Sequence, residues 1–474
     1  MSSLSIDITP HWIGGQPVAG SGATIDVVNP ADGSIVGKVP AGTAGDIDRA
    51  VGAAQSALAD WVDRPPAERI AIVREISVGL RERAGEIAES ITAEMGSPIS
   101  FSRTAQAGLP IRSLSASADA AEQFQWTEQI GNSLVIREPF GVVGAITPWN
   151  YPLHQIVAKV APALLAGNTV VLKPSEIAPR NATILAEVAQ GAGLPAGALN
   201  VVHGIGPVVG EAIAAHRDVQ MVSFTGSTRA GKSVSVVAGD TVKRVSLELG
   251  GKSANIILED ADMSKAVVLG LGSAWTNGGQ TCTAWTRMLV PSTRHDEILE
   301  QLVAVAAEYQ VGDPNDEDTR IGPLASSAQG ERVRRYIALG IAAGATLALG
   351  GDGPVGGLGN GAFVQPTIFG DVAPEALIAQ DEIFGPVLSV IPYDTEEQAI
   401  DIANNSIYGL SGAVFGEAEH ALAVAKRMRT GQVYVNGGQF NTAAPFGGYK
   451  QSGNGRELGR FGLEEFLEVK AIQR

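Results

Sequence analysis

One stretch of the chain, residues 168–204, has the sequence NTVVLKPSEIAPRNATILAEVAQGAGLPAGALNVVHG. A β-branched run ended by a turn comes first, a helical pattern follows, and a second apolar run comes last. The alternation continues with a helical pattern at 206–216 and an apolar run at 219–227. Strands of about four to eight residues that alternate with helices are typical of βαβ units. We therefore expect an α/β fold whose strands form a parallel sheet.

The second half of the chain repeats this pattern from about residue 256 to 440. The expected helices lie at 261–277, 294–309 and 396–405, and the expected strands at 287–291, 363–370, 387–393 and 432–438. The two α/β halves join near Gly250 and Gly251. We expect two large domains with a cleft between them, as the chain length also favours.

The first 148 residues contain further regular patterns. Apolar residues recur at helical spacing over 44–61 and again over 66–96, where prolines stand at the start of the second segment. Residues 132–148 instead alternate and break like strands. This part predicts two helices and an exposed hairpin that could pair with another subunit.

Composition excludes several classes of partner and site. The 474 residues carry a formal net charge of −16 without a cluster of Lys and Arg, so a nucleic-acid partner is not expected. A single cysteine cannot form an internal disulfide or a zinc site of several cysteines, and the six histidines include no HExxH pair. No apolar run suits a membrane span or a secretion signal, so we expect a cytoplasmic protein with no metal and no membrane partner.

A glycine loop follows the apolar run at 219–227. Residues 224–234, FTGSTRAGKSV, place Gly226 at the end of an expected strand and Gly231 where a helix opens, so backbone N–H groups there could hold a pyrophosphate. The spacing from Gly226 to Ser233 also matches the G-x-x-x-x-G-K-S pattern of P-loop NTPases. That alternative is disfavoured because several βα units precede the loop and no apolar strand ending in Asp is evident.

Three polar residues stand in unusual local settings. Glu248 lies between apolar residues just before two glycines, where burial would raise its pKa toward that of a general base, although a strand-end carboxylate in solvent would explain it equally well. Cys282 is flanked by glycine, glutamine and threonines, which favours a reachable thiol over a packing residue. Asn150 stands in a turn framed by Pro148 and Pro152 and could either stabilise an oxyanion or cap a helix.

Taken together, the motifs resemble the aldehyde dehydrogenase superfamily over almost the whole chain. The segments are TPWNYP, LKPSE, FTGSTRAG, LELGGKS, GQTCTAWTR, EIFGPV and PFGGYKQSGNGRELG, in the family's order. The resemblance implies a Rossmann-like NAD-binding domain, an α/β catalytic domain and a small β oligomerisation flap, in a homodimer or homotetramer. It places the NAD-binding domain at 1–120 and 140–251, the catalytic domain at 252–451, and the flap at 121–139 and 452–474. It also accounts for the glycine spacing after Gly226 without an NTPase.

The resemblance further implies three catalytic residues. Cys282 is the expected nucleophile toward an aldehyde carbonyl, and the side chain of Asn150 with the backbone N–H of Cys282 is expected to hold the oxyanion. Hydride transfer to NAD then leaves a thioester, which Glu248 is expected to hydrolyse by activating water. Glu457, in GRELG, matches a carboxylate sometimes tied to proton relay, with a structural ion pair as the alternative.

Cofactor contacts follow from the same resemblance. The expected cofactor-binding residues are Ile146, Trp149, Lys173, Ser175, Glu176, Gly226, Ser227, Gly250, Glu382 and Phe384. A carboxylate at position 176 accepts ribose hydroxyls and repels a 2′-phosphate, so we expect NAD, with NADP also possible. Glu248 likewise favours water over coenzyme A as the acyl acceptor.

The substrate is the least specified part of this expectation. The pocket is expected to be lined by Tyr151, Gln155, Ala158, Trp285, Phe440 and Phe446. Relatives that take succinic semialdehyde often have Arg in place of Ala158, so an acidic aldehyde loses support, and an aromatic cage for betaine aldehyde remains open. We expect a medium-sized aliphatic or aromatic aldehyde. The alternatives are a thiol esterase or acyl-transferring enzyme on the same scaffold, or a catalytically idle binding protein.

Overall fold

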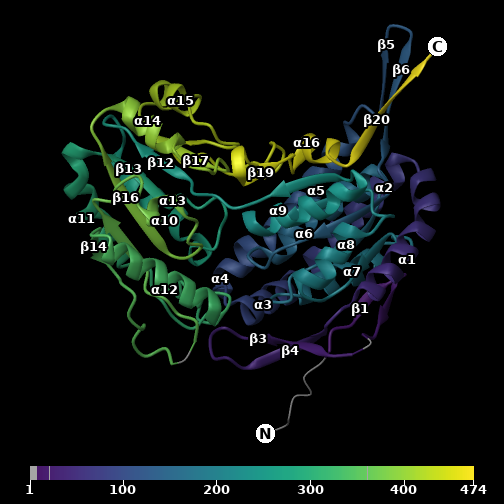
Figure 1. Ribbon diagram of the computed structural model, residues 1–474, viewed down its shortest axis with the longest axis horizontal. Coiled ribbons are helices and arrows are strands. Elements are labelled where there is room, and N and C mark those ends of the chain that lie inside the picture. Colours follow the sequence, from purple (N-terminus) through teal and green to yellow (C-terminus); the bar gives the residue numbers. More distant parts are fainter. Residues whose placement is uncertain (1–7, 21, 360) are drawn as a thin grey trace.

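The computed structural model describes residues 8–20, 22–359 and 361–474, whose strands form four sheets (Figure 1). Two of the sheets are large, with eight and seven strands, and helices cover them. The predicted α/β class and the predicted parallel strands are thus confirmed. Within the described ranges, no helix has the length and apolar character needed to cross a membrane.

The first large sheet has the strand order β19-β11-β10-β7-β8-β9-β1-β2. Its members are β1 (His11–Ile13), β2 (Gln16–Val18), β7 (Val142–Ile146), β8 (Thr169–Lys173), β9 (Leu199–Val201), β10 (Met221–Thr225), β11 (Arg244–Glu248) and β19 (Gly453–Asn454). The five central strands from β11 to β9 run parallel, and the outer strands β1, β2 and β19 are antiparallel to their neighbours. The quoted stretch 168–204 therefore forms β8, a helix and β9 as predicted.

Helices cover both faces of this sheet, as a doubly wound parallel sheet requires. They are α1 (Ala44–Asp63), α2 (Pro66–Glu82), α3 (Ala84–Met95), α4 (Ile99–Phe101), η1 (Ser102–Gln106), α5 (Gly108–Glu122), α6 (Pro152–Ala166), α7 (Arg180–Gly191), η2 (Gly206–Gly210), α8 (Glu211–Ala215), α9 (Thr228–Ala238), η3 (Gly239–Thr241) and α16 (Gly459–Glu464). Val170 and Leu172 of β8 pack on the side of α2, α5, α6 and α7, whereas Val171 packs on the side of α1 and α8. This alternation of side chains gives the two apolar cores.

Local signals explain most helix limits. Thr43 and Asp46 form a reciprocal capping box at the start of α1, and Pro66 occupies the first position of α2. The single helix predicted over 66–96 is two helices, because Arg83 has φ −99° and ψ 14° and its guanidinium is held by Glu86 and Glu187. The helix predicted at 206–216 begins as the π-helix η2 before α8.

The second large sheet has the order β14-β15-β16-β13-β12-β17-β18 and is parallel except for β14. Its members are β12 (Ala254–Ile257), β13 (Arg287–Pro291), β14 (Thr346–Leu349), β15 (Thr367–Gly370), β16 (Val387–Tyr393), β17 (Gly412–Phe415) and β18 (Tyr434–Val435). Its helical segments are α10 (Met263–Trp275), η4 (Thr276–Gly279), η5 (Ser292–Arg294), α11 (His295–Ala306), α12 (Ser327–Ala342), α13 (Leu377–Gln380), α14 (Glu396–Asn404), α15 (Ala418–Ala425) and η6 (Lys450–Ser452). In Figure 1 this sheet lies to the left of the first one.

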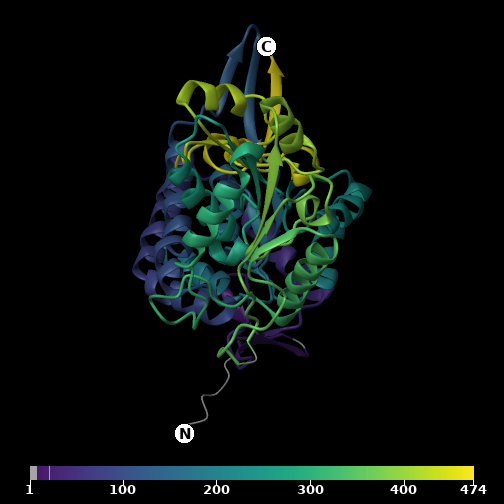
Figure 2. The same ribbon diagram turned by 90° about the vertical axis from the view of Figure 1, so that its left-hand side faces the viewer.

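A three-stranded antiparallel sheet projects from the body of the molecule (Figures 1 and 2). It consists of β5 (Thr127–Ile130), the central β6 (Ser133–Pro139) and the C-terminal β20 (Leu467–Gln473). The rest of segment 452–474 lies elsewhere, since β19 pairs with β11 and α16 contacts α5 and α6. A separate two-stranded sheet contains β3 (Thr24–Val28) and β4 (Ile35–Pro40).

The carboxyl ends of the strands in the first large sheet face the amino ends of the strands in the second. The chain leaves the carboxyl end of β11 at Glu248, passes Gly250 and Gly251, and enters the amino end of β12 at Ala254. The segments that precede β13 and β16 end at the same amino edge, because both strands run parallel to β12 in register. Loops from both sheets therefore converge in the space between them.

Candidate active site

The strand order of the first sheet marks a crevice. From β7 the chain proceeds outward to β8 and β9, and then returns to the other side of β7 to form β10 and β11. In parallel α/β sheets, ligands bind beyond the carboxyl ends of the strands where the order reverses in this way. Here that point lies between β7 and β10, which are followed by the turns containing Trp149 and Gly226.

A cavity of about 650 Å³ occupies this crevice. Six of the ten predicted cofactor residues line it: Trp149, Gly226, Ser227, Gly250, Glu382 and Phe384. The helix α9 begins at its wall, with Ser227 as the N-cap that accepts a hydrogen bond from the backbone N–H of Ala230 at 3.3 Å. Because a helix N-terminus carries unpaired N–H groups and partial positive charge, this wall suits a pyrophosphate.

Glycine lets the two sheets approach closely at this cavity. A Cβ on Gly250 would lie 2.3 Å from a carboxylate oxygen of Glu382. The other oxygen of Glu382 accepts the backbone N–H of Gly251 at 3.0 Å. Burial raises the pKa of Glu382 to about 7, against the hydrogen bond from Gly251 and the positive charges of Lys252 and Arg332. The cavity thus presents a carboxylate from the second sheet to whatever binds on the first.

The remaining predicted cofactor residues, Ile146, Lys173, Ser175 and Glu176, lie at the ends of β7 and β8, outside the lining of that cavity. Ile146 pairs with Lys173 across the two strands. Lys173 donates to Glu176 at 2.8 Å, and the hydroxyl of Ser175 accepts the backbone N–H of Ile177 at 3.2 Å. Of the ten predicted cofactor residues, six therefore line the crevice, and the other four lie beside it at the ends of β7 and β8.

Cys282 follows three consecutive residues with left-handed torsions, two of which are glycines. After α10, Asn277 and Gly278 both adopt left-handed torsions, with φ 55° and 64°. Gly279 follows with φ 72°, and a Cβ there would lie 2.1 Å from the carbonyl oxygen of Gly385. A Cβ on Gly251 would lie 2.4 Å from the carbonyl oxygen of Cys282. The loop is thus fixed by direct backbone packing on both Gly251 and the segment before β16.

A second cavity, of about 830 Å³, lies on the other side of this loop. Five of the six predicted substrate residues line it, namely Tyr151, Gln155, Trp285, Phe440 and Phe446. Ala158 does not, because it lies about one turn further along α6 and is buried there. Cys282 and Gln155 line both cavities, so the thiol stands where they meet.

The thiol of Cys282 is held in its neutral form. Burial raises the pKa of Cys282, and the negative charges of Glu382, Glu248 and Glu457 raise it further. A thiolate is the reactive species, so this site needs a base or a rearrangement of charge before the sulfur attacks.

Glu248 is buried, and its charge acts on the thiol of Cys282. It is 3% exposed, and in the described part of the chain neither of its oxygens has a hydrogen-bond partner. Burial raises its pKa well above the usual range, the charge of Glu457 acts in the same direction, and Lys159 and Arg456 oppose it. A Cβ on Gly447 would lie 2.8 Å from Glu248, so that glycine makes room for the carboxylate. Glu248 lines neither cavity in this arrangement.

Glu457 lines the substrate cavity and forms a buried ion pair with Lys159 of α6. Both side chains are almost fully buried. This contact is the ion pair that the sequence offered as the alternative to a relay role, and Lys159 is a partner that the sequence did not single out.

Asn150 is held by a network that sequence reasoning missed. Its backbone carbonyl oxygen accepts hydrogen bonds from the side-chain amides of Gln106 and Asn277, each at 2.9 Å. Its side-chain amide donates to the carbonyl of Gln280 at 3.2 Å, next to the thiol loop. Tyr151 continues the link through a 2.9 Å hydrogen bond between its hydroxyl and that of Thr281. No local sequence motif predicts these contacts, because the bonded residues lie 44 to 130 residues apart in the chain.

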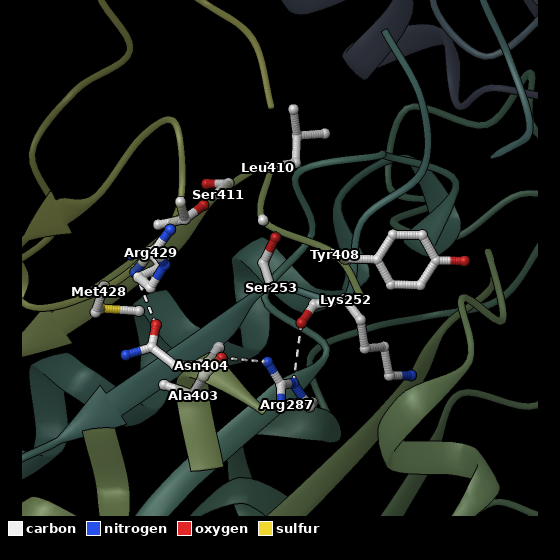
Figure 3. Close-up of a pocket in the computed structure, with 13 residues that line it drawn as sticks. Lys252, Ser253, Arg287, Ala403, Asn404, Tyr408, Leu410, Ser411, Met428 and Arg429 are labelled. Atoms are coloured by element: carbon white, nitrogen blue, oxygen red, sulfur yellow. Dashed lines mark hydrogen bonds between the residues drawn. The ribbon is translucent and has the colours of Figure 1, made fainter. Parts of the chain in front are cut away.

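Arg287 braces the amino edge of the second sheet (Figure 3). Its guanidinium donates to the backbone carbonyls of Lys252, Ile402 and Ala403, each at 2.9 Å. Burial lowers its pKa to about 10. Figure 3 shows Lys252 extending away from this guanidinium. A charged residue at the start of the apolar run RMLVP was the available signal for a buried structural role, since an isolated buried guanidinium needs such partners.

These features together define a class of protein. A crevice at a strand-order switch point and a second cavity meet at one thiol, an arrangement that suits an enzyme which binds a nucleotide cofactor and a second molecule on either side of a cysteine.

Comparison with known proteins narrows this class. Residues 18–472 match the family model described as "Aldehyde dehydrogenase family", and the chain belongs to that family. A 3-succinoylsemialdehyde-pyridine dehydrogenase from Pseudomonas sp is 50% identical over 98% of both chains. The chain is thus an NAD-dependent aldehyde dehydrogenase, which oxidises an aldehyde to a carboxylic acid with hydride transfer to NAD.

Solved structures agree over the same length. A mutant of aldehyde dehydrogenase C from Pseudomonas syringae, in complex with NAD⁺ and octanal, is 47% identical with a TM-score of 0.97, covering 98% of this chain and 96% of that one. An aldehyde dehydrogenase of Mycobacterium tuberculosis in complex with NAD⁺ is 44% identical with a TM-score of 0.96, covering 99% of this chain and 98% of that one. The whole fold, including the projecting sheet, therefore has counterparts.

Proposed function

We propose that Cys282 is the nucleophile and that aldehyde oxidation proceeds through a covalent thioester on its sulfur. The single observation that carries this proposal is the position of Cys282 at the junction of the two cavities. An aldehyde in the larger cavity can present its carbonyl carbon to the sulfur, and the sulfur adds to it to give a thiohemiacetal. The crevice on the other side of the same carbon then receives the hydride.

Asn150 and the backbone N–H of Cys282 stabilise the oxyanion that forms in this addition. The side-chain amide of Asn150 is oriented by its hydrogen bond to the carbonyl of Gln280, and Gln106 and Asn277 fix the backbone carbonyl of the same residue. A donor that needs no reorganisation stabilises developing charge most effectively. Keeping the oxygen charged rather than protonated favours departure of the hydride and leaves the thioester.

Glu248 acts as the general base that hydrolyses this thioester. Its unpartnered oxygens can accept a proton from water, and its raised pKa brings it toward the pH at which a base works best. The same group, in its ionised form, can take the thiol proton at the first step, so that the negative charge passes from the carboxylate to the sulfur.

The crevice fits NAD in shape and in chemistry. Gly226, Ser227 and the N-terminus of α9 would hold the pyrophosphate, Glu382 and Phe384 the nicotinamide ribose, and Lys173 and Glu176 the adenosine ribose. When bound, NAD supplies the acceptor for the hydride. Glu176 favours NAD over NADP because a carboxylate repels the additional phosphate.

The substrate that suits the larger cavity is a medium-sized aliphatic or aromatic aldehyde. Phe440 packs edge-on against Phe446 with ring centroids 6.2 Å apart, and Trp285 packs against Tyr434 at 5.5 Å. Rigid aromatic walls of this kind suit an apolar chain or ring. The octanal complex of the Pseudomonas syringae relative and the aryl-bearing semialdehyde in the name of the Pseudomonas sp relative support the same class.

A panel of aldehydes tests this assignment. NADH formation is followed with short, medium-length and aromatic aldehydes, and with an ester of the best acid. We expect the highest kcat/KM for a medium-length or aromatic aldehyde, with no ester turnover that exceeds the NAD-linked rate. Fast ester hydrolysis without aldehyde oxidation would instead favour a thiol esterase or an acyl-transferring enzyme.

The assembly and location complete the proposal. Residues 1–120 and 140–251 bind NAD, residues 252–451 carry catalysis, and segments 121–139 and 452–474 join subunits into a homodimer or homotetramer. Support comes from the projecting sheet, whose outer strands β5 and β20 have no further partner among the described residues. A cytoplasmic location is supported by the single cysteine, which leaves the protein without an internal disulfide.

A further inference from the structure

One wall of the substrate cavity comes from the consecutive segments α4, η1 and α5 and from α6, which packs against α5, and this wall carries a polar patch. Phe101, Ala105 and Leu109 line this wall and are apolar, and Arg112 follows about one turn later on α5. His154, on α6, lines the same wall, and its Nδ1 lies 3.4 Å from the hydroxyl of Ser113 on α5. The cavity therefore has a polar end beside an otherwise apolar wall.

The guanidinium of Arg112 has N–H groups that are not used in an ion pair between described residues. Arg74 and Arg103, on the same side of the fold, pair with carboxylates, whereas none of the ion pairs between described residues includes Arg112. Its guanidinium folds back along α5, where a Cβ on Gly108 would lie 3.1 Å from Nη1. An arginine presents five N–H donors in a fixed plane, which suits a carbonyl or carboxylate oxygen.

His154 adds a neutral donor. Burial, together with the positive charges of Lys159 and Arg112, lowers its pKa to about 4, so the imidazole is uncharged at neutral pH. When Ser113 donates to Nδ1, the ring proton lies on Nε2 and is available to the cavity.

Among the described residues that line the cavity, no unpaired carboxylate would repel an acceptor oxygen of the substrate at this polar end. Of the residues that line the cavity, the only carboxylate is Glu457, and Lys159 neutralises it. The amides of Gln155, Gln439 and Asn441 and several hydroxyl groups make up the uncharged polar part of the lining.

We propose that Arg112 and His154 form a distal subsite that binds an acceptor oxygen, of a ketone or a carboxylate, on the substrate chain away from the aldehyde carbon. The proposal rests on the proposed function and deepens it, because it names the substrate class as an aldehyde with an apolar body and a polar tail. The positive charge comes from α5, and not from the position of Ala158 on α6, where the family resemblance would look for an arginine.

The test compares three aldehydes of equal chain length: octanal, the analogue with a ketone next to the chain end, and the analogue that ends in a carboxylate. We expect Arg112→Met to lower kcat/KM for both tailed aldehydes about tenfold, mainly through KM, because a hydrogen bond to a charged donor is lost. Octanal should be oxidised at the wild-type rate. His154→Leu should affect both tailed aldehydes in the same direction, and Arg112→Lys should retain part of the preference for the carboxylate.

Arg217→Met is the matched control, since Arg217 is an exposed arginine that lines neither cavity. It should change no ratio between the three substrates. Equal effects of Arg112→Met on octanal and on both tailed aldehydes, or no effect on any of them, would overturn the subsite. A failure of wild-type enzyme to form NADH from octanal would instead count against the proposed function, so the two claims fail separately. If only the carboxylate or only the ketone analogue responds, the subsite stands and its acceptor is identified.

Discussion

At the scale of single residues, the site combines a thiol and a carboxyl group whose raised pKa values disfavour ionisation of both. Burial raises the pKa of Cys282 and of Glu248, and the surrounding carboxylates act in the same direction. Many reactive cysteines are instead activated by nearby positive charge. Once Glu248 has lost its proton, it can accept the proton of the thiol, which moves the one negative charge from the carboxylate to the sulfur and leaves the net charge of the site unchanged.

Replacement of Glu248 tests its role as a base. In Glu248→Gln the side chain keeps its shape and loses its basicity, so we expect kcat to fall about 10²–10⁴-fold. The raised pKa also makes wild-type kcat increase with pH as the carboxylate loses its proton, and this increase should vanish in the variant. Steady-state NADH formation across the pH range of the folded enzyme measures both effects.

The control for this variant is Glu465→Gln. Glu465 is half-buried, its charge also bears on Glu248, and it lines neither cavity. It should retain most of the activity and the rise with pH. A Glu248→Gln enzyme with the wild-type rate and pH profile would exclude Glu248 as the base.

At the scale of elements, the loop between α10 and β13 shows how glycine positions the sulfur. In Gly279→Ala the new Cβ would overlap the carbonyl of Gly385 at 2.1 Å, in addition to the strain of φ 72°. The loop must shift, and displacement of a reacting group by about 1 Å can cost about 10²-fold in rate. We therefore expect kcat to fall at least about 10²-fold while NAD binding persists, as measured by kinetics and by quenching of protein fluorescence.

Gly278→Ala provides a matched comparison. Gly278 has a similar φ of 64°, but a Cβ there would meet no atom closer than 3.7 Å. It should lose about 1–2 kcal/mol of stability from the left-handed torsion and much less activity than Gly279→Ala. Equal activity losses in the two variants would show that torsional strain, and not contact with Gly385, sets the loop.

The helices and strands were easier to predict from the sequence than the contacts that their side chains make with distant segments. Helices and strands followed from periodicity, as in 168–204, because their burial is repeated along the chain. The motifs around Cys282, Glu248 and Gly226 were found because each has an unusual local setting. Arg112, His154 and Gln106 were missed, because ordinary helical residues become site residues only through packing with distant segments. The break at Arg83 was missed because helix periodicity continues across it.

At the scale of the whole molecule, the projecting sheet is the part that the single chain leaves incomplete. β6 is paired on both sides, but β5 and β20 are edges. Apolar side chains on these edges are exposed, including Ile130 at 56% and Val469 at 65%. Exposed edges with apolar residues favour pairing with another chain, which agrees with the proposed homo-oligomer.

Substitution on β20 tests this assembly. Val469→Asp should shift the wild-type oligomer toward monomer, because the buried carboxylate would be costly at an interface. Val28→Asp is the control, since Val28 is an exposed valine on β3, at the opposite end of the molecule in Figure 1. Light scattering after size exclusion measures the mass of each. A wild-type monomer, or equal masses for wild type and Val469→Asp, would contradict the proposed interface.

The central claim is that the sulfur of Cys282 carries the acyl group between oxidation and hydrolysis. The most direct measurement is intact-protein mass spectrometry of acid-quenched reactions with aldehyde and NAD, run in parallel for wild type, Glu248→Gln and Cys282→Ala. We predict an added acyl mass on the wild-type and Glu248→Gln chains, and neither adduct nor NADH from Cys282→Ala although that variant binds NAD normally. NADH formation by Cys282→Ala at the wild-type rate would contradict the account.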